Sequence, residues 1–244
     1  MEDPPTTSSY YSLAKGHSYF HTGEIALAFL HFVEVARRKP DTEETVVAHQ
    51  MAGVISCMMN VSKEPALVYL YQAAQLVPRF NNPPLMIAVL RDLGETLYIA
   101  GRRTRNKELI DKGLESFNKG LNIAEIVLHQ EGLSQADITL VKIQEAITRG
   151  VRGIYRFEND SRKSGISEVK LADDYLQNLG DGYEAIQFDS HMRAMQISAL
   201  LGRLHHLRAA LRLIHDVPQL PGLHLRLWAA LLGNRAFRLA EKIR

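Results

Sequence analysis

The chain has 244 residues, of which 46% are hydrophobic, 23% charged and 7% aromatic, enough apolar material for one large domain or two small ones. Lys and Arg number 29 against 27 Asp and Glu, a formal net charge of +2, which excludes a polybasic nucleic-acid binder or an acidic disordered chain as a description of the whole molecule. The single cysteine, Cys57, excludes an internal disulfide and a thiolate zinc cage and favours a reducing compartment.

No targeting or membrane segment is indicated. The chain begins Met-Glu-Asp-Pro-Pro, without the basic start and apolar run of a signal peptide, and it contains no uninterrupted apolar stretch of about 18 residues. We therefore expect a cytoplasmic protein that does not insert into membranes, with a disordered N-terminus over residues 1–8.

Apolar residues recur at spacings of three and four rather than two, which predicts an all-α fold. Helix starts are indicated where a capping side chain precedes an early acid or a proline, at Asp41-Thr42 with Glu44, at Asn82-Pro83-Pro84, and at Ser134 with Asp137. The expected helices cover residues 9–22, 25–38, 42–59, 64–77, 84–100, 106–128, 134–156, 165–179, 183–200, 203–215 and 222–242. Short connections between them predict antiparallel hairpins.

The first hairpin carries the pattern Gly16-x-x-Tyr19-x-x-x-Gly23-x-x-x-x-Ala28-x-x-x-Phe32, followed by Pro40. This pattern resembles the tetratricopeptide repeat, in which small residues let two helices approach and an aromatic side chain fills the space between them. The chain departs from the family at Ser12, where tryptophan is usual, and at Lys15, where leucine is common. Neither change threatens the hairpin.

Further copies follow at irregular spacing. The second runs through Ala52-Gly53, Ala66, Leu70 and Ala73 to Pro78, and the third through Leu93-Gly94-x-x-Leu97-x-x-x-Gly101 to Phe117 and Gly120. Successive marker glycines stand 37 and 41 residues apart, longer than the usual repeat of about 34, which indicates lengthened helices or loops. Units around Gly150 to Leu176 and Met195 to Ile214 resemble only helical hairpins in general.

The resemblance implies a single right-handed α-solenoid domain over residues 9–244, with about five antiparallel helix pairs. The better repeats lie in 9–120 and degenerate hairpins in 134–242. The apolar stripe from Leu223 to Leu232, followed by Arg235, Arg238, Lys242 and Arg244, has the one polar side expected of a C-terminal capping helix.

In the tetratricopeptide family the first helix of each hairpin lines a concave groove. By that register the candidate partner-binding residues mix apolar, aromatic and charged groups, which suits a peptide or helical segment of another protein; the alternative is that several of them pack between helices as core. The candidates are Tyr10, Leu13, His17, Phe20 and His21 in the first hairpin, Gln50, Met51, Val54 and Met58 in the second, and Arg91, Glu95 and Tyr98 in the third.

Some family members grip the C-terminal carboxylate of chaperones with Lys, Asn and Arg side chains at set groove positions. This chain has Leu13 and His17 where the first Lys and Asn would stand, which argues against that role. Arg91 remains suited to an acidic group on another ligand through its planar fork.

Metal binding and catalysis find little support in the sequence. His17 and His21 share a helix face at a spacing that metal ligands use, with Glu24 or His49 as conceivable additions, but no HExxH or Cys/His cluster exists. No nucleophile elbow or phosphate-binding loop is present, Cys57 lies in an apolar run that predicts burial, and the pair Asp173-Asp174 reads as exposed. We therefore expect neither a cofactor nor enzymatic activity.

Two basic clusters stand out. Residues 202–244 contain eight basic and two acidic residues, a net charge of +6, which leaves −4 for the rest of the chain; this end could support self-association, whereas nucleic acid is disfavoured because no RNA motif or recognition helix accompanies it. Arg102, Arg103, Arg105 and Lys107 are expected in a lengthened turn of the third hairpin, where such charges are usually solvated.

The functional expectation is a protein–protein interaction module, a scaffold or adaptor that receives a partner segment in its groove. Two alternatives stay open: a peptide-sensing regulatory module in which occupancy tightens the superhelix, and a structural subunit of an oligomeric assembly.

Overall fold

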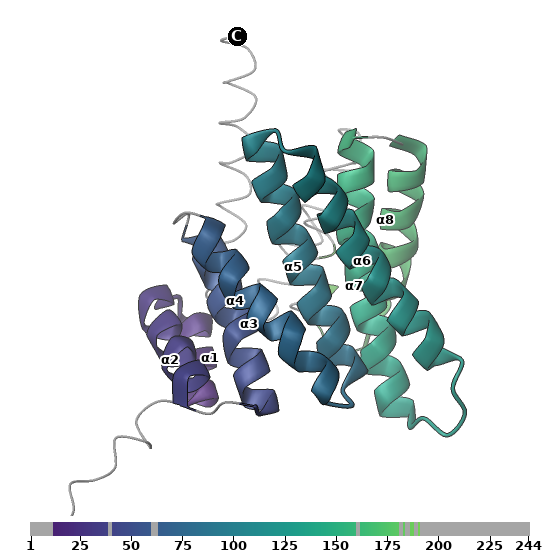
Figure 1. The fold of residues 1–244 in the computed structure, drawn as a ribbon. Helices are drawn as coiled ribbons and strands as arrows, with labels where there is room; N and C mark the ends of the chain where they lie inside the picture. The colour runs from purple at the N-terminus through teal and green to yellow at the C-terminus, as the bar shows by residue number, and fades with distance from the viewer. Residues whose placement is uncertain are drawn as a thin grey trace, which may run out of the picture. The chain divides into compact units, whose positions relative to one another are not determined.

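The computed structural model describes residues 12–38, 41–59, 63–159 and 162–180, together with Tyr183, Ile186, Gln187 and Ser190. Within these residues all regular secondary structure is helical (Figure 1), and the all-α prediction is confirmed. The α-helices are α1 (Leu13–Thr22), α2 (Ile25–Arg38), α3 (Glu43–Met58), α4 (Lys63–Leu76), α5 (Pro83–Thr104), α6 (Lys107–Leu128), α7 (Gln135–Asn159) and α8 (Arg162–Leu176), with a 3-10 turn at Val77–Arg79 after α4.

The helix starts follow from side-chain capping. Thr42 and Asn82 accept hydrogen bonds from the amides of Thr45 and Leu85 at the starts of α3 and α5, and Ser134 accepts one from Asp137 ahead of α7. Each cap satisfies one of the four amide groups that a helix start leaves without an intrahelical partner. The three predicted start signals are therefore confirmed.

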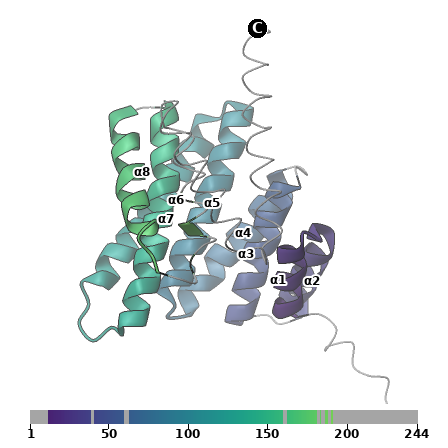
Figure 2. The ribbon, with the colours of Figure 1, turned by 180° about the vertical axis from the view of Figure 1, so that it is seen from behind.

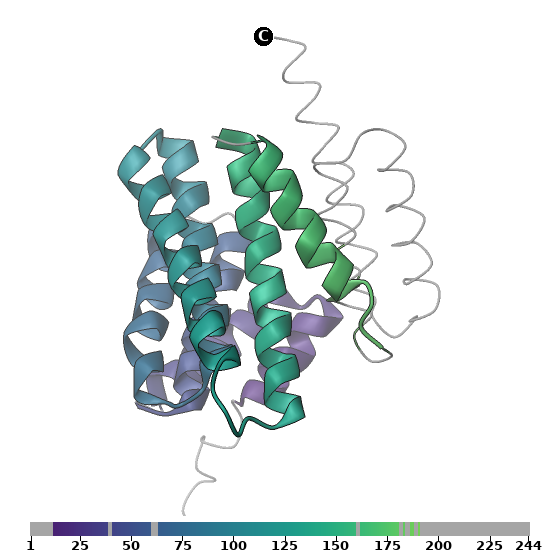
Figure 3. The same ribbon diagram turned by 90° about the vertical axis from the view of Figure 1, so that its right-hand side faces the viewer.

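The chain divides into two compact units, Met1–Phe20 with Glu24–Thr148, and His21–Gly23 with Arg149–Arg244. The first unit holds α1 up to Phe20, α2 to α6, and the start of α7. Its helices follow one another as neighbours, with α2 against α3 and α4 against α5, and Figures 1 and 2 show α5 and α6 side by side. The second unit holds the rest of α7 and α8, which run side by side in Figure 3.

One contact recurs in all four described hairpins. A glycine of the first helix faces a bulky side chain of the second so closely that a methyl group on the glycine would stand 2.5–2.9 Å from it, well inside normal van der Waals contact. Only a residue without a side chain permits this approach. The four pairs are Gly16 with Phe32, Gly53 with Leu70, Gly94 with Phe117, and Gly153 with Val169.

The core of the first unit fills the spaces between successive helices. Phe32 and Ile55 are fully buried and join α2 to α3, while Ile87 and Val141 bring α5 and α7 into one cluster. Burying side chains of this size stabilises the fold by about 1.5–3 kcal/mol each. The stacking of hairpins therefore rests mainly on apolar packing.

The α7–α8 hairpin is held by a partly buried ionic cluster. Glu168 accepts hydrogen bonds from Nε and Nη2 of Arg152, at 3.1 and 2.7 Å, and from Nη1 of Arg156, at 2.6 Å. The side chains of Arg152 and Glu168 are only 12% and 11% exposed. Burial lowers the pKa of Arg152, against the bonds to Glu168 that raise it.

Two sequence expectations about this part of the chain are wrong. The turn after α5 is not lengthened, because α5 continues to Thr104 and only Arg105 and Asn106 separate it from α6. Asp173 is not exposed: it is buried and accepts a hydrogen bond from Ser190, while Asp174 alone faces solvent. The third hairpin is therefore extended by longer helices and not by a longer loop.

Several expectations lie outside the described residues. These are the disordered segment 1–8, the helices 203–215 and 222–242 with the capping role assigned to the latter, the basic stretch 202–244, and most of the helix 183–200. The single domain over 9–244 stays a prediction.

Candidate functional site

The candidate partner-binding residues lie on the first helices of the hairpins, α1, α3 and α5. We call these helices, together with α7, the A helices. The A-helix face is the side of the first unit that the candidates other than His21 occupy. Tyr10 lies outside the described residues; the candidates that the structure places are Leu13, His17, Phe20, His21, Gln50, Met51, Val54, Met58, Arg91, Glu95 and Tyr98.

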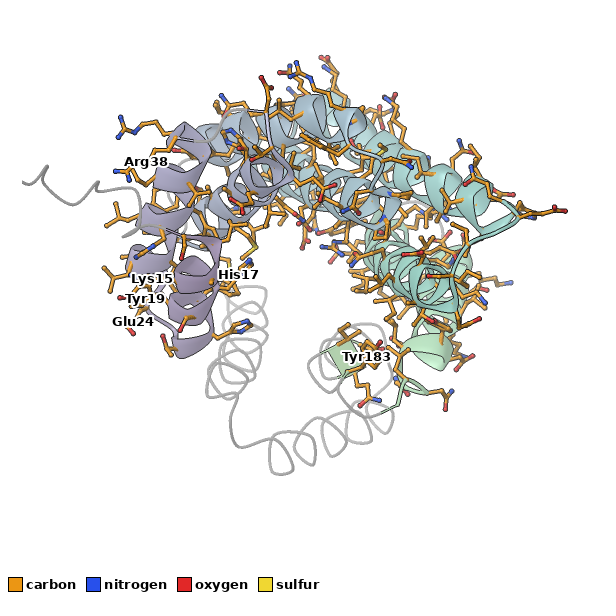
Figure 4. The ribbon with its side chains drawn as sticks, turned by 90° about the horizontal axis from the view of Figure 1, so that it is seen from below. Lys15, His17, Tyr19, Glu24, Arg38 and Tyr183 are labelled. Atoms are coloured by element: carbon orange, nitrogen blue, oxygen red, sulfur yellow. The ribbon has the colours of Figure 1, made fainter. Side chains whose placement is uncertain are left out.

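On α1 the candidates divide between packing and exposure. Leu13 and Phe20 are half-buried against the cluster around Phe32, and the ring of His17 lies edge-on to Phe32 with the centroids 5.1 Å apart. Figure 4 shows His17 on one side of α1 and Lys15 on the other. His21 is exposed.

On α3 the candidates differ in exposure along the helix. Val54 is half-buried, Met51 packs against the Ile55 cluster, and Met58 at the end of the helix is 53% exposed. Gln50 is only 8% exposed and is tied to the next hairpin, as described below. The part of α3 that is open to a ligand is therefore its second half.

A chain of polar side chains links three A helices. Nε2 of Gln50 on α3 donates to Oδ2 of Asp92 on α5 at 2.7 Å. Oδ1 of the same carboxylate accepts a hydrogen bond from Nε of Arg91 at 2.9 Å, and Nη1 of Arg91 donates to Oε1 of Gln144 on α7 at 2.8 Å. We call these four residues the polar chain.

The polar chain is largely shielded from solvent. The side chains of Arg91 and Asp92 are 16% and 11% exposed, and charge-assisted hydrogen bonds in such surroundings are stronger than neutral ones in water. The planar guanidinium of Arg91 spans two partners at once, which a lysine ammonium does not reproduce. Arg91 therefore fixes the spacing of α5 and α7, besides standing at the A-helix face.

The two remaining candidates on α5, Glu95 and Tyr98, differ in how deeply they are buried. Glu95 is half-buried on the A-helix face. Tyr98 is 1% exposed, because α6 crosses α5 so closely here that a methyl group on Gly113 would stand 3.0 Å from the Tyr98 amide nitrogen. The expectation that Tyr98 presents its ring to a partner is wrong in this structure; it is a core residue.

Asp92 and Gln144 are site residues that sequence reasoning missed. The signal for Asp92 was the adjacent opposite charges Arg91-Asp92 inside an otherwise apolar stretch from Leu85 to Leu93, which are costly to bury unless they are paired. Gln144 carries no comparable signal, because its role depends on the position of α7 beside α5.

Two histidines of the first unit, His31 and His49, are buried and half-buried respectively. His49 on α3 packs against Tyr69 with the ring centroids 6.1 Å apart, and burial lowers its pKa. His31 on α2 contacts Tyr19; burial, and secondarily the nearby Lys15 cation, lowers its pKa. Both rings are therefore favoured in the neutral form near neutral pH.

The described residues contain no group of three or more His, Cys, Asp or Glu side chains placed to hold a metal ion. Cys57 is half-buried, less enclosed than its apolar surroundings in sequence predicted. Among the helices that the structure describes, none has the length and apolar character needed to cross a bilayer.

No protein-family model matches the chain, and comparison with curated proteins finds no significant relative.

Proposed function

We propose that this protein is a cytoplasmic protein–protein interaction module, a right-handed tetratricopeptide-like solenoid that binds a peptide or helical segment of a partner on its A-helix face and performs no catalysis of its own. The repeated glycine contact in four hairpins supports the repeat architecture, since it places equivalent residues at equivalent helix crossings. The single cysteine supports a reducing compartment.

The observation that carries the proposal is the polar chain. By joining Gln50, Arg91-Asp92 and Gln144 it holds α3, α5 and α7 at fixed spacing, so the half-buried side chains beside it are presented by rigid elements. A surface that is ordered before binding loses less conformational entropy when a ligand docks. Val54 and Glu95 supply one apolar and one charged contact beside this chain.

Charge reversal at Arg91 is a poor probe of this surface. A glutamate at that position would face Asp92 and leave Gln144 without its donor, so lost binding and lost folding would coincide. Val54 and Glu95 are not among the four residues of the polar chain, so replacing them separates the two effects better.

The test is quantitative affinity capture from native lysate with the wild type, the face variant Val54→Glu with Glu95→Lys, and a matched control. The control, Val68→Glu with Glu125→Lys, makes the same chemical changes at exposed positions on α4 and α6. A protein retained by the wild type and the control, but at least tenfold less by the face variant, supports the proposal. When this captured partner is purified and bound again to the wild type, it must protect amides of α3 and α5 from hydrogen exchange.

Equal retention by all three proteins would contradict the assignment of the A-helix face. Thermal unfolding of the face variant is measured alongside, and a midpoint well below that of the control would mean that the loss of binding reflects misfolding, which removes the support. A mass that rises with protein concentration, with no partner captured, would favour the structural-subunit alternative.

A further inference from the structure

The corner between α5 and α6 carries a concentration of exposed positive charge that the A-helix face does not use. All residues from 102 to 108 are exposed, and four of the six from 102 to 107 are basic. Figure 1 shows α5 and α6 meeting at this tight corner. We call Arg102, Arg103, Arg105 and Lys107 the basic corner.

Helix structure accounts for only two of these cations. Arg102 and Arg103 lie in the last turn of α5, where positive charge is favoured by the negative end of the helix dipole and by the free carbonyl groups. Arg102 also lies over the Tyr98 ring, 6.0 Å from its centroid. Both positions are therefore explained by the stability of α5.

Lys107 breaks the same rule. It is the first residue of α6, directly after the N-cap Asn106, where the positive end of the helix dipole disfavours a cation and favours Asp or Glu. Among the described residues Lys107 forms no ion pair, since Glu108 pairs with Lys112 at 2.7 Å.

Arg105 breaks a different rule. It ends α5 in the left-handed conformation, with φ 56° and ψ 30°, which is strained for a side chain of this kind and which glycine or asparagine adopts more cheaply. Like Lys107, it has no ion-pair partner in the part of the chain that the structure describes. Two residues that work against local stability and carry the same charge at one corner point to a function outside the fold.

We infer that the basic corner is a docking site for a short acidic segment of a partner protein. The Arg105 guanidinium and the Lys107 ammonium, which have no ion-pair partner among the described residues, can recognise carboxylates directly, and the exposed corner accepts them without moving a helix. This surface is separate from the A-helix face, and the inference does not rest on the proposed function.

The composition of the corner favours an acidic peptide over a nucleic acid. No aromatic residue occurs between Tyr98 and Phe117, so no ring is available to stack on a base. The exposed carboxylates of Glu108 and Asp111 follow the cations at once and limit the positive charge to a short stretch. A short run of glutamates or aspartates fits the limited extent of the positive charge.

The experiment measures binding of a fluorescein-labelled octaglutamate peptide to the full chain by fluorescence anisotropy at low and physiological salt. The corner variant is Arg102→Gln, Arg103→Gln, Arg105→Asn and Lys107→Gln, in which asparagine keeps the left-handed conformation accessible. The control removes the same charge at exposed lysines elsewhere, Lys119→Gln, Lys142→Gln, Lys163→Gln and Lys170→Gln. We expect at least tenfold weaker binding for the corner variant and less than twofold for the control.

A single substitution separates function from folding. Lys107→Glu places a favourable charge at the start of α6 and should raise the thermal midpoint, while it weakens octaglutamate binding. A structural role for Lys107 predicts instead that its replacement lowers the midpoint.

Three results would overturn the inference. Equal weakening by the corner and control variants would show that net charge alone attracts the peptide. Equal affinity of the wild type for octaglutamine would show that carboxylates are not recognised. Tighter binding of an oligothymidylate of eight nucleotides than of octaglutamate would assign the corner to nucleic acid.

Discussion

Gly94 on α5 and Gly113 on α6 face each other across the helix crossing, and a methyl group built on either would stand 2.8 Å from the carbonyl oxygen of the other. Backbone atoms of a helix move less readily than the end of a side chain, so this crossing cannot adjust to admit a larger residue. The two longest helices of the first unit are thus in contact through their main chains, and Phe117 and Tyr98 pack on either side of the crossing.

Replacing Gly94 with alanine should lower the free energy of unfolding by roughly 2–3 kcal/mol, because the added methyl forces two backbones apart in a packed interface. Urea unfolding followed by circular dichroism measures the change. Gly120→Ala is the matched control on α6: its methyl would find its nearest neighbour at 3.7 Å, so the better helix propensity of alanine should stabilise the protein by up to about 1 kcal/mol. Equal losses in both variants would contradict the claimed crossing.

Acid should destabilise the region around His49. Nδ1 of His49 is buried and finds no hydrogen-bond partner among the described residues, and burial lowers the pKa from 6.5. The unfolded chain therefore binds the proton more readily than the folded one. The free energy of unfolding therefore has its full value above pH 6.5 and falls as the pH drops below 6.5. The pKa of His31 is also lowered, so this residue adds a change of the same sign.

The measurement is the urea midpoint at pH 7.5, 6.5 and 5.5 for the wild type and for His49→Leu, which removes the titrating group from an apolar site. The midpoint of the variant should fall less between pH 7.5 and 5.5. His129→Gln, at an exposed position, serves as the control and should follow the wild type. A His49→Leu profile parallel to the wild type would show that this ring does not control acid sensitivity.

Glu168→Gln should destabilise the α7–α8 hairpin by roughly 2–3 kcal/mol, because the partly buried Arg152 loses its anionic partner and Arg156 loses its bond to the same oxygen. Hydrogen exchange of the α8 amides is the direct readout. Glu115→Gln breaks the exposed pair with Lys119, whose side chains are 59% and 63% exposed, and should leave exchange unchanged. Slow exchange in α8 of Glu168→Gln would mean that the cluster is not needed for stability.

Helix positions were accessible from sequence because capping residues mark them independently of tertiary structure. Thr42 and Asn82 cap the starts of α3 and α5, as the residues that follow them in the sequence predict. The sequence pattern predicts the end of α5 too early, at residue 100, directly before Gly101. Gly101 is buried inside the helix against Ile110, which lies 2.8 Å from where its methyl would be, and the strained Arg105 ends the helix instead.

The site was only partly predictable, because register places a residue on a helix stripe but does not say how neighbouring helices cover that stripe. Arg91, Glu95 and Tyr98 share one stripe of α5, yet the first two are half-buried and Tyr98 is buried. An α-helix drifts by about 20° over seven residues relative to a straight stripe, and the close approach of α6 at Gly113 covers the far end. The sequence around Arg91 does not indicate hydrogen-bond partners on other helices, such as Gln144 on α7.

The polar chain also bears on which hairpins are interchangeable. In repeat proteins whose units meet only through apolar surfaces, modules are readily deleted or transplanted, since any similar neighbour closes the gap. Here, excision of α5 and α6 would remove both charged members and leave the amides of Gln50 and Gln144 facing a mismatched junction. The third hairpin is therefore bound to its neighbours by side-chain hydrogen bonds as well as by apolar packing, and another hairpin of the same shape would not replace it.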